Sequence, residues 1–167
     1  MEGLIAIGFI IAGAFAFAGS AHAATGAATL YFVGTGNTYT TAASWHSSAK
    51  ACDDAGNADA APDDDDIIIF ADNCDTSVAM PATEVLAGVQ LANSYSGTVT
   101  GSGTTLDING NFSVGSTGTF TLNGGTMTLS GNFTKGAGTF THANGTVDFD
   151  GSSQTITGSS TLYRLIK

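Results

Sequence analysis

The chain has 167 residues, a length that suits one folded domain. Its 14 acidic residues outnumber its 4 basic residues and give a formal net charge of −10 at pH 7. This charge excludes a basic surface able to neutralise phosphates, so nucleic acid is not an expected partner.

The first segment has the pattern of an export signal. An apolar run occupies residues 4–18, and small residues stand at Ala21 and Ala23, the two positions that a signal peptidase reads. Such a run is short for crossing a bilayer about 30 Å thick and is typical of a cleaved signal peptide, although the residues before it include Glu2 and no Lys or Arg. We therefore predict a signal peptide over residues 1–23 and a protein that is secreted or displayed at the cell surface.

Residues 24–84 form an acidic region, which we interpret as an N-terminal cap. The region holds most of the acidic residues of the chain and both of its cysteines, Cys52 and Cys74. An even number of cysteines in an exported chain indicates a disulfide. A bond between these two would stabilise the fold by roughly 3 kcal/mol in the chain-entropy model.

Four consecutive aspartates are the strongest candidate for a metal site. They lie directly before a strand that the sequence predicts over residues 67–70, and they are Asp63, Asp64, Asp65 and Asp66. Calcium prefers several carboxylate oxygens gathered on one loop, so calcium binding is one interpretation. The other is a solvated acidic loop in which alternate side chains point to opposite sides.

Residues 85–167 carry an internal repeat with a period of about 20 residues. The segment 106–112 returns as 127–133 and again as 147–153, each time with a glycine at its fifth position. Apolar residues alternate within each unit, which is the period of a half-buried strand. Parallel stacking places like residues on like, so we predict an all-β fold, a right-handed parallel β-helix (β-solenoid) with an N-terminal cap. An antiparallel β-sandwich is the alternative, because the same spacing of Asn-Gly turns suits hairpins.

A solenoid built from these units makes a specific prediction about the aromatic residues. Phe112 should stack near Phe133, and Phe120 should stack near Phe140. Successive turns would then rise by about 4.8 Å, the usual spacing of neighbouring strands.

Threonines fall on the face opposite the apolar residues. Flat threonine arrays on a solenoid can order water and bind ice, and a hydroxyl-rich face also suits carbohydrate. The simpler interpretation is that threonine is a good strand residue with a soluble hydroxyl. The candidate binding face consists of Thr119, Thr121, Thr126, Thr128, Thr139, Thr141 and Thr146.

The sequence offers little for catalysis. A nucleophilic serine or cysteine needs a histidine and an orienting acid. After the signal peptide the histidines are His46 and His142, and neither is near a Gly-x-Ser-x-Gly element. Asp148 and Asp150 share one face of a strand, but an ordinary solvent-facing pair is the simpler interpretation. We therefore expect no enzymatic activity and no cofactor apart from calcium.

Residues 161–167 have the pattern of a further strand. A strand at the end of a stack leaves an open edge that invites pairing with another chain. We therefore expect self-association through this end, in addition to contact with an extracellular surface or matrix such as a polysaccharide.

Several segments are similar to elements of one family. The segments Thr41–Trp45, Pro62–Phe70 and Gly151–Ile156 resemble motifs of secreted bacterial surface proteins with autotransporter-adhesin-like Gly/Thr-rich β-solenoid repeats. The cysteine-containing stretch 50–61 departs from the family pattern as an insertion. The resemblance implies an extracellular structural or adhesive module with no catalytic residues, and a carbohydrate- or ice-binding module on the solenoid face is the alternative.

Overall fold

The structure is a computed structural model that describes residues 26–34, 39–48, 60–71, 74–101, 103 and 105–167. The described residues form strands and turns, with one short 3-10 helix, η1, at Ala42–Ser44. No helix among them is long and apolar enough to cross a membrane. The predicted signal peptide over residues 1–23 lies outside the described residues.

The strands assemble into three sheets. Sheet A contains β1 (Thr29–Phe32), β2 (Trp45–His46), β3 (Ile67–Phe70), β6 (Gly88–Leu91), β9 (Phe112–Val114), β12 (Phe133–Lys135) and β15 (Ile156–Thr157). Sheet B contains β4 (Val78–Ala79), β7 (Thr98–Thr100), β10 (Thr119–Thr121) and β13 (Thr139–Thr141). Sheet C contains β5 (Thr83–Leu86), β8 (Thr105–Ile108), β11 (Thr126–Leu129), β14 (Thr146–Phe149) and β16 (Arg164–Ile166).

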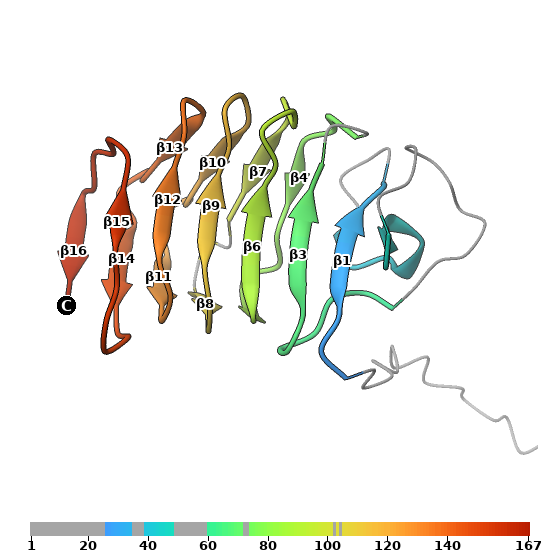
Figure 1. Cartoon of the computed structure of the whole chain (residues 1–167), viewed down its shortest axis with the longest axis horizontal. Coiled ribbons are helices and arrows are strands. Elements are labelled where there is room, and N and C mark those ends of the chain that lie inside the picture. Colours follow the sequence, from blue (N-terminus) through green and yellow to red (C-terminus); the bar gives the residue numbers. More distant parts are fainter. Residues whose placement is uncertain (1–25, 35–38, 49–59, 72–73, 102, 104) are drawn as a thin grey trace, which may run out of the picture.

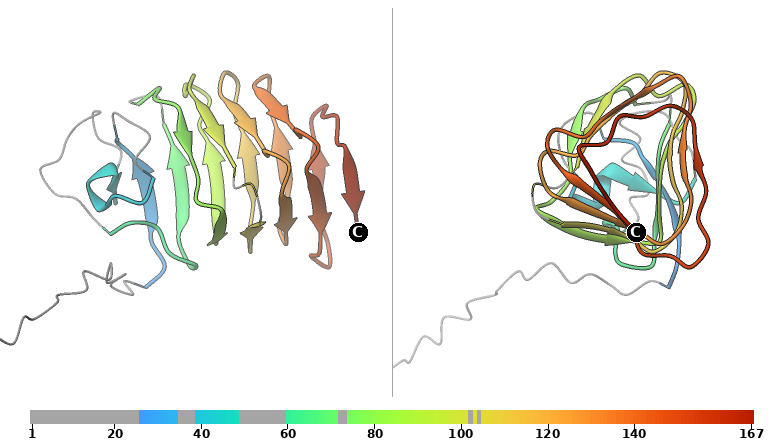
Figure 2. Two further views of the ribbon diagram at one scale, coloured as in Figure 1. Left: turned by 180° about the vertical axis from the view of Figure 1, so that it is seen from behind. Right: turned by 90° about the vertical axis from the view of Figure 1, so that its left-hand side faces the viewer.

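The chain visits the three sheets in turn and so winds as a solenoid of about five turns (Figure 1). It rises through sheet A, crosses sheet B and returns through sheet C while it advances along the axis, which makes the winding right-handed. Seen along that axis, the turns follow one roughly triangular outline (Figure 2). Strands of successive turns pair in parallel, and only β1 and β2 pair antiparallel. The predicted solenoid is therefore confirmed, and the antiparallel sandwich is wrong.

The core is a set of apolar columns that run along the solenoid. Phe112 pairs with Phe133 in register, and their ring centroids lie 5.3 Å apart. Phe120 pairs with Phe140 in the same way, with centroids 5.9 Å apart and rings nearly parallel. Both predicted aromatic stacks are confirmed. Alternation turns one face of every strand inward, and the parallel register places like residues of neighbouring turns side by side.

The glycine shared by the repeats marks a corner at which the turns approach closely. A Cβ atom added to Gly131 would overlap the backbone of Gly110 in the preceding turn, and one added to Gly151 would overlap the backbone of Ser130. The corner therefore needs a residue without a side chain. Each unit keeps its glycine for this steric reason.

The N-terminal end is closed by aromatic side chains. Trp45 is fully buried, donates its indole N–H to the Tyr39 carbonyl oxygen at 2.6 Å and packs edge-on against Phe32. Parallel stacking already starts beneath this end, because β3 pairs along its length with both β1 and β6. The strands β3, β4 and β5 thus belong to one turn of the solenoid within the acidic region.

Candidate functional site

Sheet B carries the most regular threonine array. Its strands β7, β10 and β13 all read Thr-x-Thr, and they pair residue by residue. The central residue of each strand points inward and is buried, so both flanking threonines point outward. The array has two straight rows, which are Thr98, Thr119 and Thr139, and Thr100, Thr121 and Thr141.

A second threonine row lies on sheet C. Thr83, Thr105, Thr126 and Thr146 occupy successive turns at the same register. The neighbouring outward row is mixed, because Thr128 lies between two aspartates, Asp107 and Asp148. The threonines predicted from sequence therefore divide between two sheets, and the two-row arrangement belongs to sheet B.

The four threonines in the earlier turns were missed by the sequence analysis. Thr98 and Thr100 extend the rows of sheet B, and Thr83 and Thr105 extend the row of sheet C. Thr83, Thr98 and Thr100 lie before the first recognisable repeat segment at 106–112, and Thr105 directly precedes it. The short patterns Thr-Val-Thr and Thr-Leu-Asp-Ile were the signal that would have found three of them.

Three of the four predicted aspartates lie close together. One carboxylate oxygen from each of Asp63, Asp65 and Asp66 falls within 4.8 Å of the others. Desolvation raises the pKa of Asp63, and a hydrogen bond with Asp65 and the negative charge of Asp66 raise it further. Asp64 instead lines a cavity nearby. Calcium binding stays a prediction.

Asp66 also has a structural role in this loop. Its side chain is 1% exposed and accepts the backbone N–H of Ala28 at 2.9 Å and that of Asp63 at 3.0 Å. Charge-assisted bonds of this kind order a turn and satisfy amides that would otherwise lack an acceptor. Asp66 therefore joins the aspartate loop to the segment that leads into β1.

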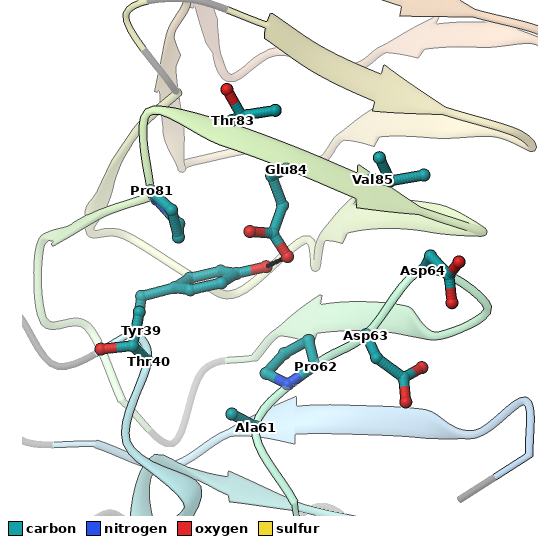
Figure 3. A pocket seen from close by; sticks show the side chains of 10 residues that line it. All are labelled: Tyr39, Thr40, Ala61, Pro62, Asp63, Asp64, Pro81, Thr83, Glu84 and Val85. Atoms are coloured by element: carbon teal, nitrogen blue, oxygen red, sulfur yellow. Dashed lines mark hydrogen bonds between the residues drawn. The ribbon is translucent and has the colours of Figure 1, made fainter. Parts of the chain in front are cut away.

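A cavity of about 420 Å³ opens over the exposed edge of β5 at the N-terminal end of sheet C (Figure 3). Sheet A continues past this level with β1, whereas β5 is the last strand of sheet C. The cavity is lined by Tyr39, Thr40, Ala61, Pro62, Asp63, Asp64, Pro81, Thr83, Glu84 and Val85.

Glu84 is the unusual residue of this cavity. It is in register with Leu106, Met127 and Val147, which are all fully buried in the core. Its carboxylate accepts the hydroxyl proton of Tyr39 at 3.1 Å. Desolvation raises the pKa of Glu84 to about 7, and the hydrogen bond from Tyr39 opposes that rise.

The side chain of Tyr39 is only 4% exposed. This burial and the charge of Glu84 raise the pKa of its hydroxyl. Neither residue of this pair was predicted from the sequence. The available signal was a glutamate in an apolar position of a strand, Thr-Glu-Val-Leu at 83–86.

The other residues considered for chemistry are dispersed. His46 is buried in β2, while the Nδ1 atom of His142 accepts the backbone N–H of Asn144 at 3.1 Å. Asp148 points outward from β14, and Asp150 accepts the hydroxyl of Ser130 at 2.8 Å. Cys74 is buried, and Cys52 lies outside the described residues, so the disulfide stays a prediction.

The C-terminal end exposes the edges of β15 and β16, the last strands of sheets A and C. Three large apolar side chains are exposed there, Ile156 at 50%, Leu165 at 52% and Tyr163 at 64%. The basic residues Lys135, Arg164 and Lys167 also belong to the last two turns. Self-association through this end stays a prediction.

Comparison with known proteins adds no relative. No protein-family model matches the chain, and no curated protein or solved structure matches it.

Proposed function

We propose that the protein is an extracellular structural or adhesive surface module, with the two threonine rows of sheet B as its contact face. The observation that supports this proposal is the register of β7, β10 and β13, which repeats Thr-x-Thr at the same place in three turns. Regular hydroxyls on a rigid scaffold match a partner that is itself periodic, such as a polysaccharide chain in an extracellular matrix.

The physical basis of the proposal is preorganisation. Parallel pairing holds neighbouring turns about 4.8 Å apart, so the threonines are fixed before any partner arrives. Binding then costs less side-chain and backbone entropy than binding by a mobile loop. Threonine also offers a methyl group and a hydroxyl together, which suits the mixed apolar and polar surface of a sugar ring.

Location outside the cell follows as part of the same proposal. The pattern of residues 1–23 and the two cysteines support export to an oxidising compartment. Fractionation of a culture expressing the full chain tests it. We expect the protein in the medium or at the cell surface, and retention in the cytoplasm would contradict export.

Binding by the threonine face is tested with two matched triple variants. The first replaces Thr100, Thr121 and Thr141 on sheet B by valine, which keeps the shape and the strand preference and removes the hydroxyls. The second makes the same change on sheet C, at Thr105, Thr126 and Thr146. A glycan array and films of matrix polysaccharide provide the probes.

We expect the wild-type protein and the sheet C variant to bind equally, and the sheet B variant to lose at least tenfold in affinity. Equal binding by both variants would contradict the assignment of the contact face. Wild-type protein that binds none of these probes would contradict polysaccharide as the partner.

Ice is the second candidate ligand, because two straight rows of threonine on a flat parallel sheet form an array that can order water. An assay of ice recrystallisation with the same three proteins distinguishes it. Inhibition that disappears in the sheet B variant alone would favour ice over carbohydrate, and no inhibition by wild type would eliminate this candidate.

A further inference from the structure

We propose that the cavity over β5 is a binding site for a primary ammonium group carried on an aliphatic stem, with the carboxylate of Glu84 as the principal counter-charge. The class covers free alkyl diamines and the lysine side chain of a partner protein. This inference is independent of the threonine face, which lies on another sheet.

The first argument is the position of Glu84 in the solenoid. In three following turns the same register position holds a fully buried apolar residue, at Leu106, Met127 and Val147. A carboxylate in such a position is partly desolvated, which is costly for the folded chain. An opposite charge brought into the cavity would offset that cost, and a ligand is therefore stabilised there more than at an exposed carboxylate.

The second argument is that, among the described residues, Glu84 has one hydrogen-bond partner, which contacts one of its two carboxylate oxygens. The Tyr39 hydroxyl donates to Oε1, and in Figure 3 the other carboxylate oxygen points away from that hydroxyl, toward Pro81. A primary ammonium has three donors and no acceptor. It can donate to this second oxygen and to the hydroxyl oxygen of Tyr39, whose own proton is already committed to Glu84.

The third argument is the charge of the surroundings. Asp63 and Asp64 line the same cavity, and every lining residue is acidic or uncharged at neutral pH. In the described part of the chain, the basic residues Lys135, Arg164 and Lys167 lie in the last two turns, at the opposite end of the solenoid. A ligand that carries a positive charge would therefore complement the acidic lining of the cavity.

The walls of the cavity favour an alkyl stem over a bare ion. Ala61, Pro62, Pro81 and Val85 contribute apolar surface beside the carboxylate, and the ring of Tyr39 lies between the two prolines in Figure 3. A cavity of about 420 Å³ has room for a chain of several methylene groups. Each methylene that leaves water for such a wall adds to the affinity of the ligand.

The affinity should depend on pH through Glu84. The groups that face it are Tyr39, Asp63 and Asp64, with Asp66 close enough to act on Tyr39. With a pKa of about 7, Glu84 is ionised in about one molecule in ten at pH 6 and in about nine in ten at pH 8. An alkyl ammonium keeps its charge over this range, because its pKa is about 10.4. The apparent affinity should therefore rise about tenfold from pH 6 to pH 8.

Isothermal titration calorimetry and NMR chemical-shift mapping on the full chain test the proposal. The probes are pentane-1,5-diamine for a free amine and Nα-acetyl-lysine methylamide for a lysine side chain, with pentan-1-ol as the uncharged control. The variants are Glu84→Gln, which keeps shape and the acceptor for Tyr39, and Asp107→Asn, which removes an outward-facing carboxylate from the next strand of sheet C.

We expect saturable binding of at least one amine, shifts centred on Tyr39 and Glu84, and a loss of at least tenfold in Glu84→Gln but not in Asp107→Asn. Binding of the diamine alone would identify a free amine as the ligand, and binding of the lysine derivative would identify a partner protein. Equal binding of pentan-1-ol, equal binding by Glu84→Gln, or no binding of either amine at pH 8 would overturn the proposal.

Discussion

Replacing Glu84 by glutamine should stabilise the protein at alkaline pH and have little effect in acid. The folded-state pKa of Glu84 lies above its usual value, at about 7 instead of 4.5. At a pH below 4.5 the side chain is neutral in both the folded and the unfolded chain, and the folded state has no charge penalty. Between pH 4.5 and about 7 the unfolded chain binds fewer protons at this residue than the folded chain, so stability falls as the pH rises, and the loss is complete above pH 7.

The size of this effect follows from the two pKa values. The change from 4.5 to about 7 corresponds to about 3.4 kcal/mol at most. Glu84 is only partly buried, and water that reaches the cavity screens its charge, so we reduce the expected effect to about 1.5 kcal/mol. Glutamine stays neutral and still accepts the Tyr39 hydroxyl proton, so the variant should avoid this loss and melt about 3–6 °C higher than wild type at pH 8.5.

Thermal unfolding followed by circular dichroism at pH 5 and pH 8.5 measures the effect. The relevant quantity is the change with pH in the difference between Glu84→Gln and wild type, which cancels the titration of all other groups. Asp107→Asn is the control, because it measures the change in melting temperature when an outward-facing carboxylate of the same sheet is removed. If the Glu84→Gln difference is the same at both pH values, the desolvation of Glu84 is refuted.

Three further substitutions test the packing that supports the sites. Gly131→Ala should destabilise the fold by more than about 2 kcal/mol in urea unfolding, because its Cβ would overlap the backbone of the preceding turn. Gly103→Ala should be tolerated, because the nearest atom to its added Cβ lies 3.6 Å away. Equal effects of the two substitutions would contradict the close corner. Phe120→Ala should destabilise the fold by about 3–5 kcal/mol in the same measurement, because the ring is fully buried against Phe112 and Phe140. A loss below about 1 kcal/mol would contradict the stacked core. Asp66→Ala should destabilise the fold by about 1–3 kcal/mol in thermal unfolding, because two backbone amides lose their acceptor. Asp65 is exposed, so Asp65→Ala should change the stability by no more than about 0.5 kcal/mol. Similar effects of the two substitutions would contradict the structural role of Asp66.

The repeated part of the fold could be predicted because its residues obey one local rule. A strand with alternating apolar residues identifies its inward face, and the return of Phe112 as Phe133 after about one repeat aligns neighbouring turns. The corner glycine, seen at Gly131 and Gly151, adds a steric signal of the same period. These signals fade toward the N-terminus. Gly88, which follows β5, has room for a Cβ atom, and the stacking of β3 on β6 was not foreseen.

The cavity could not be predicted, because it depends on contacts that have no period. Tyr39 and Glu84 are 45 positions apart in sequence, and nothing in either local pattern points to the other. Their pairing arises because sheet C stops at β5 while the cap continues over sheet A. The threonine rows were only partly predicted for a similar reason, since assigning Thr119 and Thr126 to different sheets requires the corner between them.

The alignment of successive turns is the central claim, because it creates both the threonine rows and the inward position of Glu84. The most direct test is a nuclear Overhauser spectrum of the labelled full chain, read at the aromatic rings and the strand amides. Contacts between the rings of Phe112 and Phe133, and between those of Phe120 and Phe140, are the predicted result. Antiparallel contacts between β8 and β9 without these ring contacts would contradict the account.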